Sequence, residues 1–185
     1  ILIGSLAIHH SAFAKNGVRI PVSLGATLDE QAVDISGDTI IVGAFPDNIA
    51  RIYAAGLNDV WKEEAVLRGV GVGVKYKFGY SVDVSGQARG KATLAIVGAP
   101  GAGPRDAENS GAVFIYGRSG RQWNQLTKIV APDAEKGDYF GDAVGIHRST
   151  AVIGAPRDDD VGRDTGAVYI FVQGETTGRW ELQAK

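Results

Sequence analysis

The 185-residue chain has no cysteine and no methionine, and its charges nearly cancel. Without cysteine, neither disulfides nor thiolate metal sites can form. A formal net charge of −2 and a pI near 5.9 provide no basic surface for nucleic acid. No apolar run approaches the roughly 18 residues that a membrane-spanning helix needs. We therefore expect no nucleic-acid partner and no membrane span in this sequence.

Helix signals are also missing. No window combines sustained 3.6-residue periodicity with capping residues, and the nearest candidate is 60–68. Its tryptophan, Trp61, keeps the phase of Trp123 and Trp180, each followed by alternating polar and apolar residues, so a strand is the better interpretation. The chain has instead 26 glycines and a hydrophobic content of 44%. This composition is typical of a β-structure that turns often around a real core.

A repeat of about 55 residues organises the chain. Its clearest marks are Gly-Ala pairs, with 55 residues from Gly43 to Gly98 and 56 from Gly98 to Gly154. Phe-Gly pairs at 78–79 and 140–141 precede the second and third of these marks. Because several landmarks keep one phase, each unit carries the same short segments in a fixed order.

The four segments of each unit are predicted strands. We place them at about 79–85, 93–99, 111–117 and 122–131 in the second unit, and at 141–147, 150–155, 166–173 and 179–185 in the third. The second segment of each unit is a continuous apolar run of strand length, which implies cover on both faces. Short turns at 36–38 and 147–149 join the first two strands of their units. Stacked four-stranded antiparallel blades satisfy all of these features.

These residues carry a resemblance to a known family. Phe-Gly, then Val-Gly-Ala-Pro, then Gly-Ala-Val-aromatic, with tryptophan in the outer strand, resembles the FG-GAP repeat. This repeat is the blade unit of the integrin α-subunit propeller and of many bacterial and algal surface proteins. The variant with an aspartate-rich loop, here 157–164, is the most similar. The resemblance covers about 31–185 and implies an all-β β-propeller at the cell surface or outside the cell, although a fold alone does not define a function.

The repeat predicts about three blades and a partial one. We expect a partial or degenerate blade at 1–29, an eroded FG-GAP unit at 30–70, a unit at 71–132, and a unit with a truncated outer strand at 133–185. Closed propellers have about four to eight blades, so this set is an incomplete ring. Its open faces would expose apolar patches, with Ile96, Val97, Val152 and Ile153 as the expected lining. We therefore expect missing blades or other chains to complete the propeller.

Calcium is the cofactor that the resemblance suggests. Integrin-like blades hold it in an aspartate-rich loop between the Phe-Gly strand and the Val-Gly-Ala-Pro strand, and this sequence has plain turns there. Acidic residues gather one loop later, where Asp158, Asp160 and Asp164 are candidate ligands because calcium takes six to eight oxygens. Asx turns and solvation explain such a loop equally well. Calcium therefore remains a candidate, and no cofactor is certain.

The loops at one rim are the expected binding surface, because loops on a rigid scaffold commonly carry function. The predicted ligand-binding residues are Arg105, Asp106 and Glu108 in one loop and Arg157 and Arg163 in the next. A protein or a glycan is the expected ligand. The alternative is a structural or assembly subunit that docks within a larger complex. No nucleophile elbow, phosphate loop or zinc signature is present, so we predict no catalytic residue and no enzyme.

The repeated aromatic residues have a structural interpretation. We expect Phe78 and Phe140 to be wedges between blades, with Gly79 and Gly141 allowing close approach. The three tryptophans are expected to pack along the outer strands.

Overall fold

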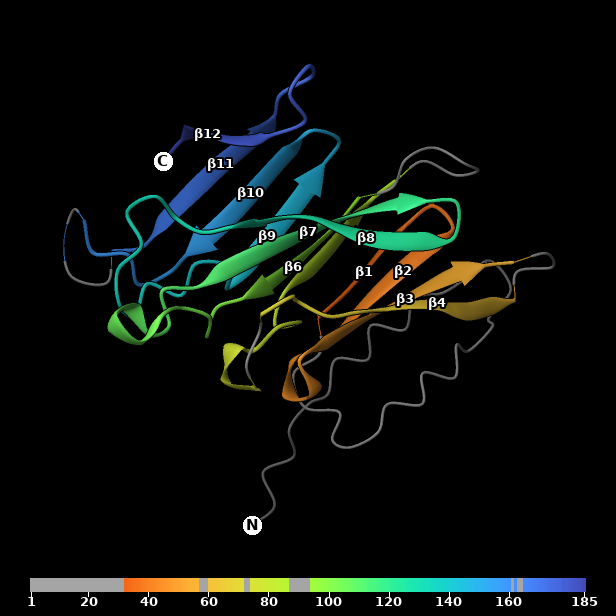
Figure 1. Ribbon diagram of the computed structural model, residues 1–185, viewed down its shortest axis with the longest axis horizontal. Coiled ribbons are helices and arrows are strands. Elements are labelled where there is room, and N and C mark those ends of the chain that lie inside the picture. The colour runs from red at the N-terminus through yellow and green to blue at the C-terminus, as the bar shows by residue number, and fades with distance from the viewer. Residues whose placement is uncertain (1–31, 57–59, 72–73, 87–93, 161, 163–164) are drawn as a thin grey trace, which may run out of the picture.

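The structure is a computed structural model in which residues 32–56, 60–71, 74–86, 94–160, 162 and 165–185 are described. The predicted partial blade at 1–29 lies outside these residues. The described chain forms three four-stranded antiparallel sheets, which we call blades 1, 2 and 3 (Figure 1). This confirms the predicted all-β class and the incomplete set of blades. No helix among the described residues is long and apolar enough to cross a membrane.

Each blade is made of four strands that follow one another in the chain. Their bounds are, in blade 1, β1 Val33–Ser36, β2 Thr39–Ala44, β3 Ile49–Ala55 and β4 Trp61–Leu67; in blade 2, β5 Val82–Ser85, β6 Leu94–Ala99, β7 Ala112–Ser119 and β8 Gln122–Ile129; and in blade 3, β9 Ala143–His147, β10 Thr150–Ala155, β11 Ala167–Gln173 and β12 Trp180–Ala184. In the part of the chain that the structure describes, 3-10 turns lie between strands at η1 Phe45–Asp47, η3 Val74–Tyr76 and η4 Arg105–Ala107. The segments predicted for blades 2 and 3 match these strands to within three residues at each end.

Local chemistry explains the regular blade. Gly37 adopts a φ of 61° in the turn between β1 and β2, a conformation that suits glycine. The corresponding turn between β9 and β10 places Arg148 at a φ of 53°. In every blade the pairing of the two outer strands shifts at one place, after Ile52, Ile115 and Ile170. Each outer strand therefore carries its irregularity at the same position of the repeat.

Two apolar clusters join the blades. One contains Ile41 and Ile52 of blade 1 together with Val97 of blade 2, and Phe78 lies in it with no exposed surface. The other joins Ile96 of blade 2 to Ile153 of blade 3 and contains Phe140, also with no exposed surface. The predicted wedge role of the two phenylalanines is confirmed. Their rings meet aromatic side chains of their own blades edge-on, at 5.3 Å for Phe78 with Phe114 and 5.2 Å for Phe140 with Tyr169.

The repeated glycines mark where blades come closest. A Cβ placed on Gly43 would lie 2.1 Å from the carbonyl oxygen of Gly79, and one on Gly98 would lie 2.0 Å from that of Gly141. Gly79 and Gly141 have φ values of 93° and 91°. The Gly-Ala glycine of one blade is thus a socket that receives the Phe-Gly carbonyl of the next blade. No larger residue fits in either place.

Polar bonds add to these contacts at the innermost strands. Asp34 of β1 accepts a hydrogen bond from the backbone N–H of Val84 at 3.0 Å. At the corresponding place in the next joint, Asp83 of β5 accepts one from Ile146 at 2.5 Å. The hydroxyl of Ser85 accepts from the N–H of Arg148 at 3.1 Å. The innermost strands β1 and β5 therefore each hold the backbone of the innermost strand of the next blade.

The predicted lining of the open faces is wrong for three of its four residues. Ile96, Val97 and Ile153 have no exposed surface, because neighbouring blades cover them. Val152 is 42% exposed, as expected, since it points away from blade 2. The periodic pattern identified buried strands correctly, but it did not show which face of each strand a neighbour covers.

Candidate functional site

The two predicted rim loops lie at the same end of the blades. The first, between β6 and β7, contains η4, and the second connects β10 to β11 (Figure 1). The segment that links blade 2 to blade 3 runs between them. Its Gly137 N–H donates to the Glu108 carbonyl at 3.1 Å, and its Asp138 carbonyl accepts from the Arg157 N–H at 3.3 Å. The fold therefore brings together two loops that lie about fifty residues apart in the sequence.

The predicted ligand-binding side chains of the first loop face solvent. Arg105, Asp106 and Glu108 are all exposed. Two of them, Arg105 and Glu108, line a cavity of about 390 Å³, together with Lys75, Tyr76, Gly101, Gly103 and Pro104. The loop itself is well anchored, because Gly111 donates to the Ala102 carbonyl at 2.8 Å. The loop therefore presents charged side chains to solvent while a backbone hydrogen bond holds its ends together.

The second loop presents a different surface. Arg157 is exposed, and its guanidinium carbon lies 4.9 Å from the ring centre of Tyr139, within cation–π range. Tyr139 belongs to the segment between the blades and has a φ of 58°. Arg163 lies outside the described residues. Of the five predicted ligand-binding residues, four are therefore placed, and all four are at one rim.

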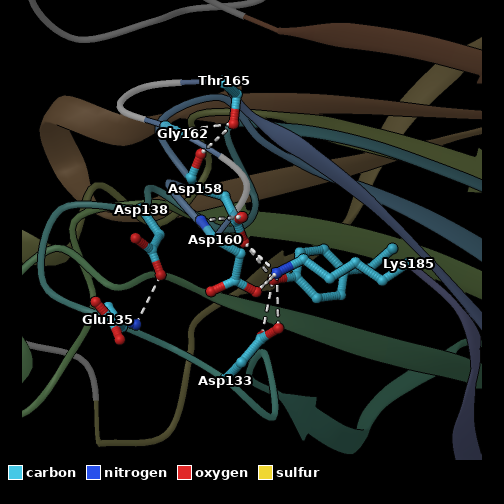
Figure 2. A network of polar contacts seen from close by, with 9 residues as sticks. Asp133, Glu135, Asp138, Asp158, Asp160, Gly162, Thr165 and Lys185 are labelled. Atoms are coloured by element: carbon cyan, nitrogen blue, oxygen red, sulfur yellow. Dashed lines mark hydrogen bonds and ion pairs between the residues drawn. The ribbon is translucent and has the colours of Figure 1, made fainter.

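A cluster of charged side chains lies behind the second loop (Figure 2). Carboxylate oxygens of Asp133, Asp158 and Asp160 all lie within 4.8 Å of one another. The ammonium of Lys185 lies 2.7 Å from Asp133 Oδ2 and 2.7 Å from Asp158 Oδ2, and it also contacts Asp160. The Tyr169 hydroxyl is 2.6 Å from Asp158 Oδ2 and 2.8 Å from Asp133 Oδ1, so it donates its one proton to either carboxylate. We call these five residues the lysine cage.

Separate parts of blade 3 contribute to the cage. Asp158 and Asp160 begin the loop after β10, and the Asp158 carboxylate accepts the Asp160 N–H at 3.4 Å in an Asx-type turn. Tyr169 comes from β11, and Lys185 follows directly after β12. Asp133 comes from the segment between blades 2 and 3. The cage thus joins the loop, the outer strand and the connection to the preceding blade.

Charge and burial explain the ionisation of the cage. Burial by itself would raise the pKa of Asp158, but hydrogen bonds from Lys185 and Tyr169 outweigh it and hold the pKa below its ordinary value. The same balance lowers the pKa of Asp133. Burial, followed by the hydrogen bond to Asp158, raises the pKa of the Tyr169 hydroxyl. Both aspartates are therefore ionised at neutral pH, opposite a charged lysine.

The predicted calcium ligands are placed only in part. Asp158 and Asp160 do lie together, and their third partner in the structure is Asp133, while Asp164 lies outside the described residues. Three carboxylates this close can hold a cation. Here the ammonium of Lys185 provides the positive charge at their centre, and calcium would need six to eight oxygens in place of that ammonium. With Lys185 in position, the cage does not fit calcium.

The sequence gives no sign that Asp133 belongs to the lysine cage. It follows Pro132 in the connection between two units, where an aspartate is typical of a turn. Its neighbour Asp138 does fill that role, since its carboxylate accepts the N–H of Glu135 at 2.6 Å. The two residues lie five positions apart in one segment, and only their surroundings distinguish them. No local signal reveals that Asp133 faces Tyr169 and Lys185 from a later part of the chain.

A second cavity, of about 790 Å³, lies where the innermost strands end. It is lined by Ile35, Ser36, Asp83, Val84, Ser85, Gly86, Leu94, Ile146, His147, Arg148 and Gln173. Burial, with a smaller contribution from a hydrogen bond to the Asp34 carboxyl, raises the pKa of Asp83 to about 7. Among the hydrogen bonds found for the described residues, none joins His147 to a serine and an acid. The cavity walls therefore contain no catalytic triad of described residues.

A comparison with protein families gives one match. The family described as FG-GAP repeat matches residues 123–171, which run from β8 of blade 2 through β11 of blade 3. This stretch contains Phe140 and Gly141, which enter the joint with blade 2, and Gly154, the Gly-Ala glycine of blade 3. No curated protein matches the chain.

Proposed function

We propose that this chain is a non-enzymatic β-propeller recognition or adhesion module that binds a protein or glycan through its rim loops. The match of residues 123–171 to the FG-GAP repeat supports this proposal. We further propose an extracellular or cell-surface location, where FG-GAP repeats are typically found. The observation that carries the proposal is the convergence of the two loops at one rim. Rigid blades hold them, and their charged side chains project into solvent.

The chemistry of the rim favours a ligand with acidic groups. Arg105 and Arg157 both expose guanidinium groups, which bind carboxylates and sulfates through pairs of parallel hydrogen bonds. Tyr139 lies beneath Arg157 and adds an aromatic surface to the same region. Asp106 and Glu108 add acceptors beside them. Acidic saccharides and acidic protein loops are therefore the ligand classes that we propose.

An array experiment tests this proposal. The intact chain is applied to arrays of neutral, sulfated and carboxylated glycans and of purified extracellular matrix proteins, and Arg105→Glu/Arg157→Glu is compared with it. Arg121→Glu/Arg179→Glu is the matched control, because these exposed arginines lie in the turns after β7 and β11, at the opposite end of the strands. We expect binding that the rim variant loses and the control keeps. Absence of binding to every array member, or equal loss in both variants, would contradict the rim as the binding surface.

A second candidate function is an assembly subunit that docks within a larger complex. The exposed apolar face of blade 3 favours it, with Val152 at 42% and Val168 at 55% exposure. Stoichiometric copurification of the chain with a fixed partner, unaffected by Arg105→Glu/Arg157→Glu, would support this alternative over a rim ligand.

A further inference from the structure

We propose that the face of blade 3 that points away from blade 2 is a docking surface for a further blade, one that opens with Phe-Gly and comes from outside residues 1–185. We call this surface the trailing face and define it by Val152, Gly154, Val168 and Ile170. The inference concerns the joint between blades, not the rim. It therefore does not depend on the rim ligand.

The trailing face repeats a socket that is filled twice elsewhere in the chain. Gly43 of blade 1 and Gly98 of blade 2 each approach the carbonyl of a Phe-Gly glycine so closely that a Cβ would lie about 2 Å from it, at 2.1 and 2.0 Å. Gly154 occupies the same register, since it pairs with Val168 as Gly98 pairs with Val113. A Cβ on Gly154 would meet nothing nearer than 3.5 Å. Gly154 is thus a third socket with open space where the other two hold a carbonyl.

The apolar side chains around the socket follow the same rule. Ile96 and Val113 of blade 2 have no exposed surface, because blade 3 covers them. The residues in the same register on blade 3 are Val152 and Val168, which are 42% and 55% exposed. Blade 3 therefore has the apolar side chains that pack against the next blade in blade 2, but in blade 3 these side chains are exposed.

The two filled joints define what the occupant must bring. In each, the incoming blade carries its own buried phenylalanine and a glycine at a φ near 90°, 93° for Gly79 and 91° for Gly141. Both Phe-Gly pairs of this chain are already used in its own joints. A second copy would present blade 1, whose sequence has Asp29-Glu30 at the place of Phe-Gly. Aspartate has no aromatic ring to act as the wedge, and glutamate, unlike glycine, rarely adopts a φ near 90°. A second copy therefore does not fit, and a separate Phe-Gly blade does.

The proposed joint would be less polar than the other two. At the positions of Asp34 and Asp83, blade 3 has Gly145, and at the position of Ser85 it has His147. Gly145 cannot accept a hydrogen bond through a side chain from the next innermost strand. The occupant is therefore held by the glycine socket and by apolar contact, which makes Phe-Gly the main determinant of docking.

A cysteine-labelling experiment tests the proposal, helped by the absence of cysteine from the chain. Val152→Cys places a single thiol on the trailing face. A second copy of residues 133–185 is appended after Lys185 of the full chain, so that its Phe-Gly can reach the socket. The matched control carries the same extension with its Phe-Gly changed to Ala-Val. The readout is the rate at which the thiol reacts with a maleimide.

We expect the intact extension to slow labelling about tenfold or more, because burial protects a site from reagents in solution. The control extension should leave the rate at that of the unextended chain. If the added unit does not fold by itself, an extension of residues 71–185, which brings its own buried joint and opens with Phe78-Gly79, replaces it. Unchanged labelling with both intact extensions would overturn the proposal. Glycan and matrix-protein arrays report separately on the rim, so failure of one proposal is distinct from failure of the other.

Discussion

Blades 2 and 3 have nearly the same sequence pattern but different surroundings. Blade 2 has a neighbour on each side, and Ile96 and Val97, which point to opposite faces of β6, are both fully buried. In blade 3, Ile153 is fully buried while Val152 is 42% exposed. The comparison shows that a continuous apolar strand can be buried by a neighbouring blade on each of its two faces. Each face is buried only where a neighbouring blade is present.

The polar contacts of the two blades differ as well. The indole N–H of Trp123 in blade 2 donates to Glu64 of blade 1 at 2.9 Å, and Glu64 also pairs with Arg118 at 2.6 Å. Trp180, at the same position of blade 3, is buried at its indole nitrogen and has no hydrogen-bond partner. The residue of blade 2 equivalent to Glu64, at the register shift of the outer strand, is Leu126. Leucine has no side-chain acceptor for the indole N–H of Trp180. Apolar packing is thus repeated more faithfully than polar pairing.

The strongest test of the difference between blades 2 and 3 is to add a Cβ at the socket glycine of each blade. Gly98→Ala should lower the free energy of unfolding by about 3 kcal/mol or more, because its Cβ would overlap backbone atoms of Gly141 that cannot move away freely. Gly154→Ala should change stability by only about 0.5 kcal/mol, since the space around it is open. Urea unfolding of the two variants measures both values. Equal losses would mean that the sockets are not the closest points between blades.

Removing a wedge should have an effect of similar size. Phe140→Ala takes a fully buried ring out of the second apolar cluster, so we expect a loss of about 3–5 kcal/mol. Leu126→Ala is the control, because Leu126 is 51% exposed and its truncation should cost far less. Thermal unfolding followed by circular dichroism reports both. A loss no greater for Phe140 than for Leu126 would contradict the wedge role.

The lysine cage distinguishes blade 3 and should contribute less. Lys185→Met removes the cation from Asp133, Asp158 and Asp160, and we expect a loss of about 1–3 kcal/mol at pH 7. Because the folded-state pKa values of Asp133 and Asp158 are lowered, the stability they contribute is present above their unfolded pKa values and is lost as the pH falls through the folded ones. The difference between wild type and variant should therefore shrink below about pH 4.

Calcium offers a control on the same pair of proteins. The wild type should show no rise in melting temperature when calcium is added, because Lys185 already occupies the centre of the cage. Lys185→Met, with the ammonium gone, is the variant in which added calcium can reach the three carboxylates. A calcium-dependent rise in the wild type would show that the ion displaces Lys185 and that calcium binds the unaltered chain.

A further expected effect is a pH dependence at the inner joint between blades 2 and 3. Burial raises the pKa of Asp83 to about 7, well above its value in an unfolded chain. A carboxyl with a raised folded pKa destabilises the fold increasingly as the pH rises from about 4 to about 7. Asp83→Asn keeps an acceptor for the Ile146 N–H but removes this titration. Denaturation across that pH range should give a flatter profile for the variant, with Asp106→Asn, an exposed rim residue, as the control.

Much of the fold was predictable because its signals are local. The 55-residue step, the short turns and the continuous apolar strands each depend on residues close in the chain, and they identified all four strands of blades 2 and 3. The strand at Trp61 was predicted by phase alone. The candidate site was less predictable. The sequence places Arg105 and Arg157 in two loops, but only the backbone bonds of the connecting segment bring these loops to one rim.

The sequence by itself determined the blade, its repeat and the residues that seal one blade against another, because Phe-Gly and Gly-Ala have no alternative of the same size and backbone freedom. Tertiary structure alone decided which faces are covered and where charges meet. Asp133 and Lys185 are 52 residues apart, and their pairing arises from the return of β12 toward the preceding connection. Gly98 and Gly154 both begin a Gly-Ala-Pro sequence, yet the space beside Gly98 is filled and the space beside Gly154 is open, since burial depends on the neighbouring blade and not on the residue.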